Sequence, residues 1–138
     1  SFVDYVLEHI LLGFFPNDEP EVEKLLNPDQ PLGTYGSKVR MIYCLGLIDK
    51  IIRDDLRLIG KIRNKFAHDL YASFDDEQIK SWCRQLQWHR ISMFREPPTD
   101  ATTRDFYQVG VNQVISYLNG IVGMARAYKR KIRTDYSG

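Results

Sequence analysis

Hydrophobic residues recur at every third or fourth position along most of the chain, which is the spacing of an amphipathic α-helix. No stretch shows the sustained alternation of apolar and polar residues that is typical of a half-buried strand. Glycine and proline divide the pattern into segments. The sequence therefore predicts an all-α fold, a compact bundle of about five or six helices.

The predicted helices differ in length and in how they begin. Pro20 suits the first turn of the second helix, and Asp49 can cap the fourth. An apolar stripe from Tyr107 to Ile132 predicts a long C-terminal helix. The expected helices cover about residues 2–13, 19–26, 37–48, 49–69, 75–87 and 103–132.

Three glycines interrupt the long C-terminal helix. Gly110, Gly120 and Gly123 each weaken a helix by about 1 kcal/mol relative to alanine. Glycines in this position indicate either close packing against another segment or a local bend. The sequence leaves both interpretations open.

The composition is that of one globular domain covering residues 1–138. The chain is 43% hydrophobic and 27% charged, and no apolar run approaches the roughly 20 residues that cross a bilayer. No basic segment or cleavage pattern marks a signal peptide. We expect a cytoplasmic protein without membrane contact; whether it is a segment of a longer protein stays open.

The two cysteines do not form a recognisable metal or disulfide pattern. Cys44 and Cys83 are 39 positions apart, with no second cysteine or histidine near either. This spacing matches neither a zinc site nor a disulfide framework. We expect both to be reduced core residues, and we expect no metal and no cofactor.

Basic and acidic residues nearly balance, with 19 and 18 respectively and a net charge of +1. No overall field therefore attracts nucleic acid, and RNA binding would be local. The candidate contacts to an RNA backbone are Lys61, Lys65, Lys129 and Arg130, although solvated helix surfaces carry the same residues. No helix-turn-helix pattern is present, so we do not expect sequence-specific reading of DNA.

The segment from Asp49 to Asp69 carries an arginine on its apolar side. A buried, unpaired guanidinium is costly, so Arg63 needs an acid, a ligand or a water-filled groove. The simplest explanation is that its stem packs while its head reaches solvent or an acid such as Asp55 or Asp69. The apolar side of this segment comprises Ile52, Leu56, Ile59, Ile62, Phe66 and Leu70, and the polar side comprises Arg53, Arg57, Lys61, Asn64, Lys65 and His68.

Arg63, Asn64 and His68 are candidate catalytic residues for RNA cleavage. A guanidinium can stabilise charge that develops on phosphorus, and an imidazole can move a proton near pH 7. Asn64 precedes His68 by four positions and can orient its ring. The alternative is that a histidine near a helix C-terminus only interacts favourably with the helix dipole.

The run Arg63-Asn64-Lys65-Phe66-Ala67-His68 resembles the motif of the HEPN superfamily, in which an arginine and usually a polar residue precede a histidine. This resemblance implies an all-helical dimer with the motif helices of two subunits beside a shared groove. It also implies a metal-independent endoribonuclease that uses Arg63, Asn64 and His68 as catalytic residues. Because attack by a 2′-hydroxyl is required, RNA and not DNA would be cleaved.

A longer stretch is similar to the mannitol operon repressor family. The similarity rests on Pro31-Leu32-Gly33, the run from Lys38 to Ile48, Asp55-Leu56 and the run from Ile62 to His68. It implies a regulator of gene expression without its own DNA-binding element, which acts as a homodimer through RNA or a regulatory protein. A toxin or phage-defence ribonuclease, or a purely structural adaptor, stays as an alternative, and the sequence specifies neither target nor effector.

Overall fold

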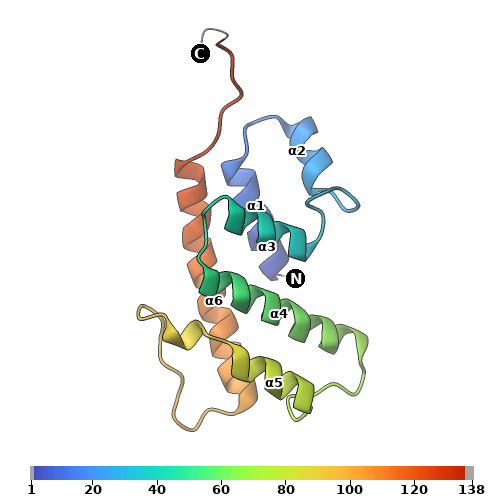
Figure 1. Cartoon of the computed structure of the whole chain (residues 1–138), viewed down its shortest axis with the longest axis vertical. Helices are drawn as coiled ribbons and strands as arrows, with labels where there is room; N and C mark the ends of the chain where they lie inside the picture. The colour runs from blue at the N-terminus through green and yellow to red at the C-terminus, as the bar shows by residue number, and fades with distance from the viewer. Residues whose placement is uncertain (1, 136–138) are drawn as a thin grey trace. The chain divides into compact units, whose positions relative to one another are not determined.

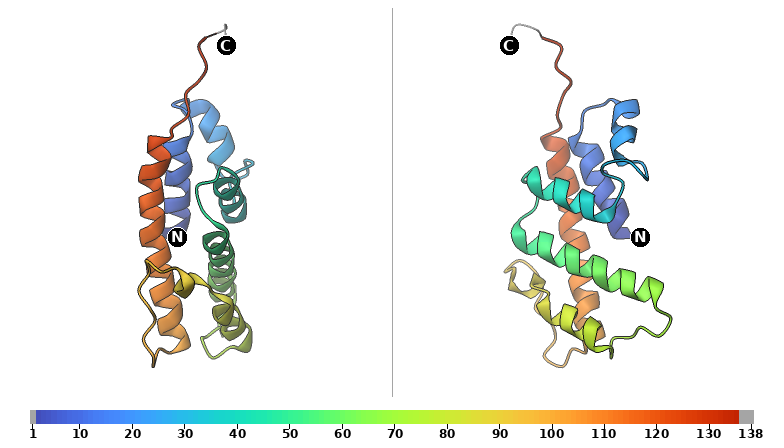
Figure 2. Two further views of the ribbon diagram at one scale, coloured as in Figure 1. Left: turned by 60° about the vertical axis from the view of Figure 1, so that its left-hand side comes forward. Right: turned by 45° about the vertical axis from the view of Figure 1, so that its right-hand side comes forward.

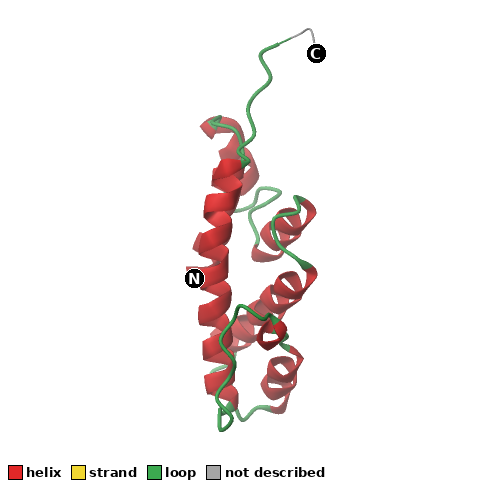
Figure 3. Cartoon of the chain, turned by 90° about the vertical axis from the view of Figure 1, so that its left-hand side faces the viewer, coloured by secondary structure: helices red, strands yellow, loops and turns green. Residues whose placement is uncertain are grey.

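Helices account for the regular structure of residues 2–135, the part of the chain that the computed structural model describes (Figures 1 and 3). This confirms the all-α class and the long C-terminal helix. The elements are α1 Phe2–Phe14, α2 Glu19–Leu26, α3 Tyr35–Cys44, α4 Lys50–His68, α5 Glu77–Gln85, the short 3-10 helix η1 Trp88–Arg90, and α6 Thr103–Ala127.

Polar side chains cap the N-termini of five of the described helices, Thr102 being the capping residue of α6. Each accepts a hydrogen bond from a backbone N–H group of the first turn, which would otherwise lack a partner. The predicted cap is confirmed, because Asp49 Oδ1 accepts from the Ile52 N–H at 2.9 Å. The capping residues of α2, α3, α4 and α5 are Asp18, Thr34, Asp49 and Asp76.

Two helices end earlier than their apolar spacing predicts. The chain leaves α3 at Cys44, and Gly46 follows with a φ of 77°, a conformation that favours glycine. α6 ends at Ala127, and Ile132 beyond it is 58% exposed. In both cases the apolar spacing continues beyond the last helical residue. Spacing alone therefore does not predict where a helix ends.

Besides Ile132, four residues that we expected in the core are exposed. Phe2 is 58% exposed at the start of α1, Leu70 is 97% exposed just after α4, and Tyr128 is 65% exposed just after α6. Cys44 is exposed as a free thiol, whereas Cys83 is buried and free. Burial raises the pKa of the Cys83 thiol to about 11, which disfavours the thiolate.

The first compact unit comprises residues 1–47 and 118–138, described up to 135. Within it, α1 packs against α3, and the C-terminal part of α6 runs beside α1 (Figure 2). Its largest fully buried side chains are Leu7, Ile10, Leu11, Val39, Ile42 and Leu118.

The second compact unit comprises residues 48–117 and is built around α4. α4 packs against α5 and against η1. The buried face of α4 is the one that the sequence predicts, with Ile52, Leu56, Ile59 and Ile62 almost inaccessible to solvent. Ile62 forms one buried cluster with Ile79 and Cys83 of α5, and Leu86 and Trp88 are also buried in this unit.

A buried carboxyl group in α4 holds the start of η1. Asp55 is fully buried, and its Oδ1 accepts from the Gln87 N–H at 2.8 Å. The backbone N–H of Trp88 also donates to this carboxyl group. Among the described residues, Asp55 Oδ2 has no hydrogen-bond partner. Burial raises the pKa of Asp55 to about 6, despite the opposing effect of the two N–H groups.

The Trp88 indole lies directly against the backbone of α6 at Gly110. The side chain is fully buried, and its ring packs against Phe106 at 5.0 Å between centroids. A Cβ atom at Gly110 would overlap the indole, whereas Gly120 and Gly123 each face open space. Close packing therefore explains Gly110 and does not explain the other two glycines.

Substitution of these glycines tests that contact. We expect Gly110→Ala to lower the free energy of unfolding by about 2 kcal/mol, because the new methyl group overpacks the indole. Gly120→Ala in the same helix should instead raise it by about 0.5–1 kcal/mol, because alanine favours helix and meets no neighbour. Urea denaturation measures both, and equal effects would contradict the assigned packing.

Candidate functional site

The three predicted catalytic residues lie on the last turns of α4 and differ in their exposure to solvent. Arg63 is half-buried, as expected for an arginine on the apolar side of the helix, whereas Asn64 and His68 are exposed. Within the described residues, the structure gives no hydrogen bond between the Asn64 amide and the His68 ring. His68 is therefore accessible from solvent, but Asn64 does not orient its imidazole in this state.

Arg63 lies next to an aromatic cluster on the buried side of α4. The Phe66 and Phe74 rings are 4.9 Å apart, and the Phe74 and Tyr107 rings are 5.6 Å apart. Burial raises the pKa of Tyr107, and the positive charge of Arg63 acts against this shift. The guanidinium is thus close enough to Tyr107 to stabilise its phenolate electrostatically.

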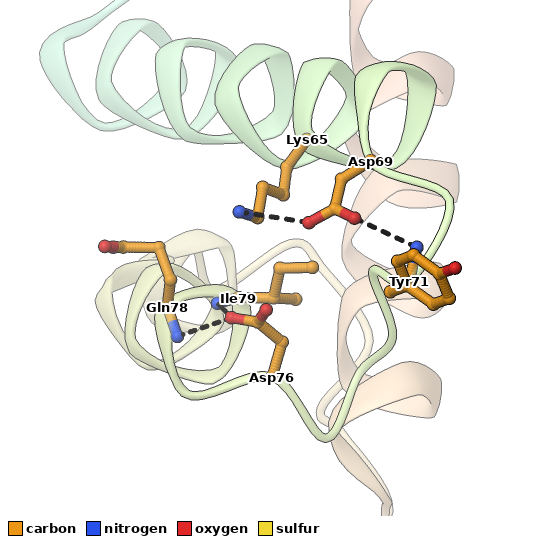
Figure 4. A network of polar contacts seen from close by, with 6 residues as sticks. All are labelled: Lys65, Asp69, Tyr71, Asp76, Gln78 and Ile79. Carbon is orange, nitrogen blue, oxygen red and sulfur yellow. Dashed lines mark hydrogen bonds and ion pairs between the residues drawn. The ribbon is translucent and has the colours of Figure 1, made fainter.

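A small polar network fixes the chain just after α4 (Figure 4). Lys65 Nζ lies 3.3 Å from Asp69 Oδ2, and the Tyr71 N–H donates to Asp69 Oδ1 at 2.9 Å. These two donors lower the pKa of the Asp69 carboxyl. Asp76, which follows in the same loop, caps α5 by accepting from the Gln78 N–H at 2.8 Å.

Two large side chains next to His68 extend into solvent. Leu70 is 97% exposed and Tyr71 is 92% exposed. The apolar spacing predicts Leu70 on the buried side of α4, and this prediction is wrong. The helix ends at His68, and the backbone then turns so that Leu70 leaves that side. Asp69 is the C-cap residue of α4, and recognising it as the helix end would have placed Leu70 outside the helix.

An open groove of about 550 Å³ adjoins the same end of α4. It is lined by Phe66, Ala72, Ser73, Phe74, Asp75 and Arg104. Arg63, Asn64 and His68 are not among its lining residues in the described part of the chain. The charged groups that line it are the Arg104 guanidinium and the Asp75 carboxylate. Because both are exposed to solvent, they can bind a ligand that carries both charges only weakly.

The four candidate RNA contacts have different surroundings. Lys61 and Arg130 are exposed, whereas Lys65 is paired with Asp69. Lys129 Nζ donates to the backbone carbonyl groups of Leu12 at 3.2 Å and Phe15 at 2.6 Å. Lys129 therefore stabilises the C-terminal end of α1, where carbonyl groups lack helical partners.

The described residues contain no group of three or more histidine, cysteine, aspartate or glutamate side chains placed to hold a metal ion. None of the helices in this part of the chain is both long and apolar enough to span a membrane.

Comparison with solved structures shows a similar fold in the X-ray structure of the MtlR–HPr complex from Escherichia coli. The TM-score is 0.57 with 24% sequence identity, over 91% of this chain and 84% of that chain. At this level of identity the match describes the fold.

Comparison of sequences identifies curated relatives and a family. The mannitol operon repressors of Escherichia coli strains K12 and CFT073 are each 40% identical over 79 residues. These alignments cover 56% of this chain but only 39% of each relative. The sequence profile of the MtlR family, described as mannitol repressor, matches residues 7–122. This chain therefore belongs to the mannitol repressor (MtlR) family.

Proposed function

We propose that this chain is a cytoplasmic regulator of gene expression of the mannitol operon repressor type, and that it acts by binding another protein. The observation that carries the proposal is the family match over residues 7–122. The similar solved structure contains HPr as a second protein. An HPr-type protein is accordingly our proposed partner.

The charges of the chain favour a protein partner over direct DNA binding. A DNA-binding surface needs several free cations, because each phosphate contact displaces counterions. Lys65 and Lys129 are already engaged within the chain. With a net charge of +1, the remaining basic residues are balanced by nearly as many acids.

We also propose that the chain acts as a homodimer, and that the exposed end of α4 takes part in the interface. Leu70 and Tyr71 expose apolar surface that a second copy would remove from water. Such an arrangement would bring His68 from both subunits near one groove.

A second candidate function is a metal-independent endoribonuclease. The observation that favours it is the exposure of His68 on the last turns of α4, five residues after the half-buried Arg63. An imidazole in this position can reach a 2′-hydroxyl group, and the arginine can approach the adjacent phosphate. This function would make Arg63, Asn64 and His68 the catalytic residues.

A reporter assay tests the regulator. The chain should lower expression from the Escherichia coli mannitol operon promoter several-fold in a strain that lacks its own repressor. The double variant Arg63→Ala, His68→Ala, provided that it stays folded and keeps the oligomeric state of the wild type, should repress equally if regulation depends on binding and not on RNA cleavage. Unchanged reporter expression, with the folded chain present in the cells, would contradict the proposal.

A cleavage assay tests the ribonuclease. Purified protein incubated with total RNA in EDTA should produce fragments, and Arg63→Ala or His68→Ala should reduce the rate by about 10²-fold or more. Single-stranded DNA is the matched control, and it should stay intact because it lacks the 2′-hydroxyl group. RNA that stays intact with the folded wild-type protein would exclude this activity.

A further inference from the structure

The near-neutral total charge of the chain conceals a strongly acidic N-terminal segment. Residues 1–34 carry seven carboxylate side chains and one lysine. The single lysine, Lys24, is 3.4 Å from Glu21 and is thereby paired. The carboxylates belong to Asp4, Glu8, Asp18, Glu19, Glu21, Glu23 and Asp29.

A groove of about 540 Å³ lies between α1 and α2 in this acidic segment. Leu12, Val22 and Leu26 supply apolar lining, and Val22 and Leu26 are otherwise buried. The acidic lining consists of Glu8, Asp18, Glu19 and Glu23. Among the described residues, no basic side chain lines the groove.

An exposed apolar strip on α1 continues into this groove. Phe2, Tyr5 and Leu12 are 58%, 57% and 43% exposed, and their spacing places them on one side of the helix. The Tyr5 ring also packs against His9 at 4.2 Å between centroids. Leu12 belongs to both the strip and the groove, so the two form one continuous surface.

The chemistry of this surface specifies its occupant. Exposed apolar side chains bordered by charged ones are typical of protein interaction sites. The acidic lining repels phosphate groups and attracts lysine and arginine. We infer that the α1–α2 groove docks a segment of a partner protein in which basic residues surround an apolar side chain. This inference rests on the proposed function, since it describes how a regulator of this type binds its partner.

In the inferred complex, the apolar side chain of the partner enters the groove against Leu12, Val22 and Leu26. The basic residues around it face Glu8, Glu19 and Glu23. A groove of this volume can hold a large aliphatic or aromatic side chain together with adjoining atoms. Apolar contact supplies most of the affinity, and the charges select the partner and accelerate association.

Titration of the full chain with a synthetic peptide tests the surface. The probe is an amphipathic helical peptide with leucines on one side and lysines on the other. NMR shifts should change in α1 and α2, and calorimetry should give binding that weakens with salt. Replacing Glu8, Glu19 and Glu23 together by glutamine should weaken binding about tenfold or more. Asp18 is left unchanged because it caps α2.

A matched variant controls for net charge. Glu77→Gln, Glu96→Gln and Asp100→Asn remove three exposed carboxylates outside the groove, and affinity should stay within about twofold of wild type. Lack of peptide binding, shifts located outside α1 and α2, or equal weakening in both variants would overturn the inference. If sedimentation shows a changed oligomeric state for the groove variant alone, the surface binds a second copy of this chain. This result would also overturn the inference.

Purified HPr separates this inference from the proposed function. Binding of HPr that the groove variant weakens supports both. HPr binding that is equal in wild type and groove variant leaves the proposed partner intact and overturns the inference. Peptide binding in the groove without HPr binding supports the inference and removes HPr as the partner.

Discussion

One buried carboxyl group connects the central helix of residues 48–117 to the segment that follows α5. Asp55 accepts hydrogen bonds from the first two N–H groups at η1, where no helical carbonyl is available to them. This contact fixes where the backbone turns after α5. Trp88 can then be placed in the core, with its indole against Gly110.

This constraint also determines how the end of α4 is presented. Asp55 and five isoleucine and leucine side chains of α4 are buried, so the rotation of the helix is fixed. About two to four turns after Asp55, the same rotation leaves Asn64 and His68 in solvent and places Arg63 at the margin of the core. The surface available for a partner or for RNA is thus a consequence of packing on the opposite side.

The sequence predicts the helices well, because capping residues and apolar spacing are local signals. Asp49 marks the start of α4, and the bounds predicted for α2 agree with the structure. Local spacing fails at Leu70 and Ile132, which continue a stripe after the helix has ended. Local patterns also do not predict contacts between residues that are distant in sequence. Examples are the hydrogen bond between Asp55 and Gln87 and the packing of Trp88 against Gly110.

In the candidate sites, too, local features are predictable from the sequence and long-range contacts are not. The position of Arg63 on the apolar side of α4 follows from helical geometry alone. The role of Lys129 does not, because its carbonyl acceptors in Leu12 and Phe15 are distant in sequence. The groove between α1 and α2 likewise depends on how two helices pack, although the acidic character of residues 1–34, which include its four lining carboxylates, is evident in the sequence.

The stability of the chain as a function of pH tests the role of Asp55 most directly. Its pKa is about 6 in the folded state and 3.8 in the unfolded state, so the folded state binds more protons between these values. The free energy of unfolding of wild type, relative to Asp55→Asn, should therefore rise by up to about 3 kcal/mol as the pH falls from about 7.5 to about 4. A relative stability that stays constant or falls on acidification would contradict a buried, desolvated carboxyl group at the start of η1.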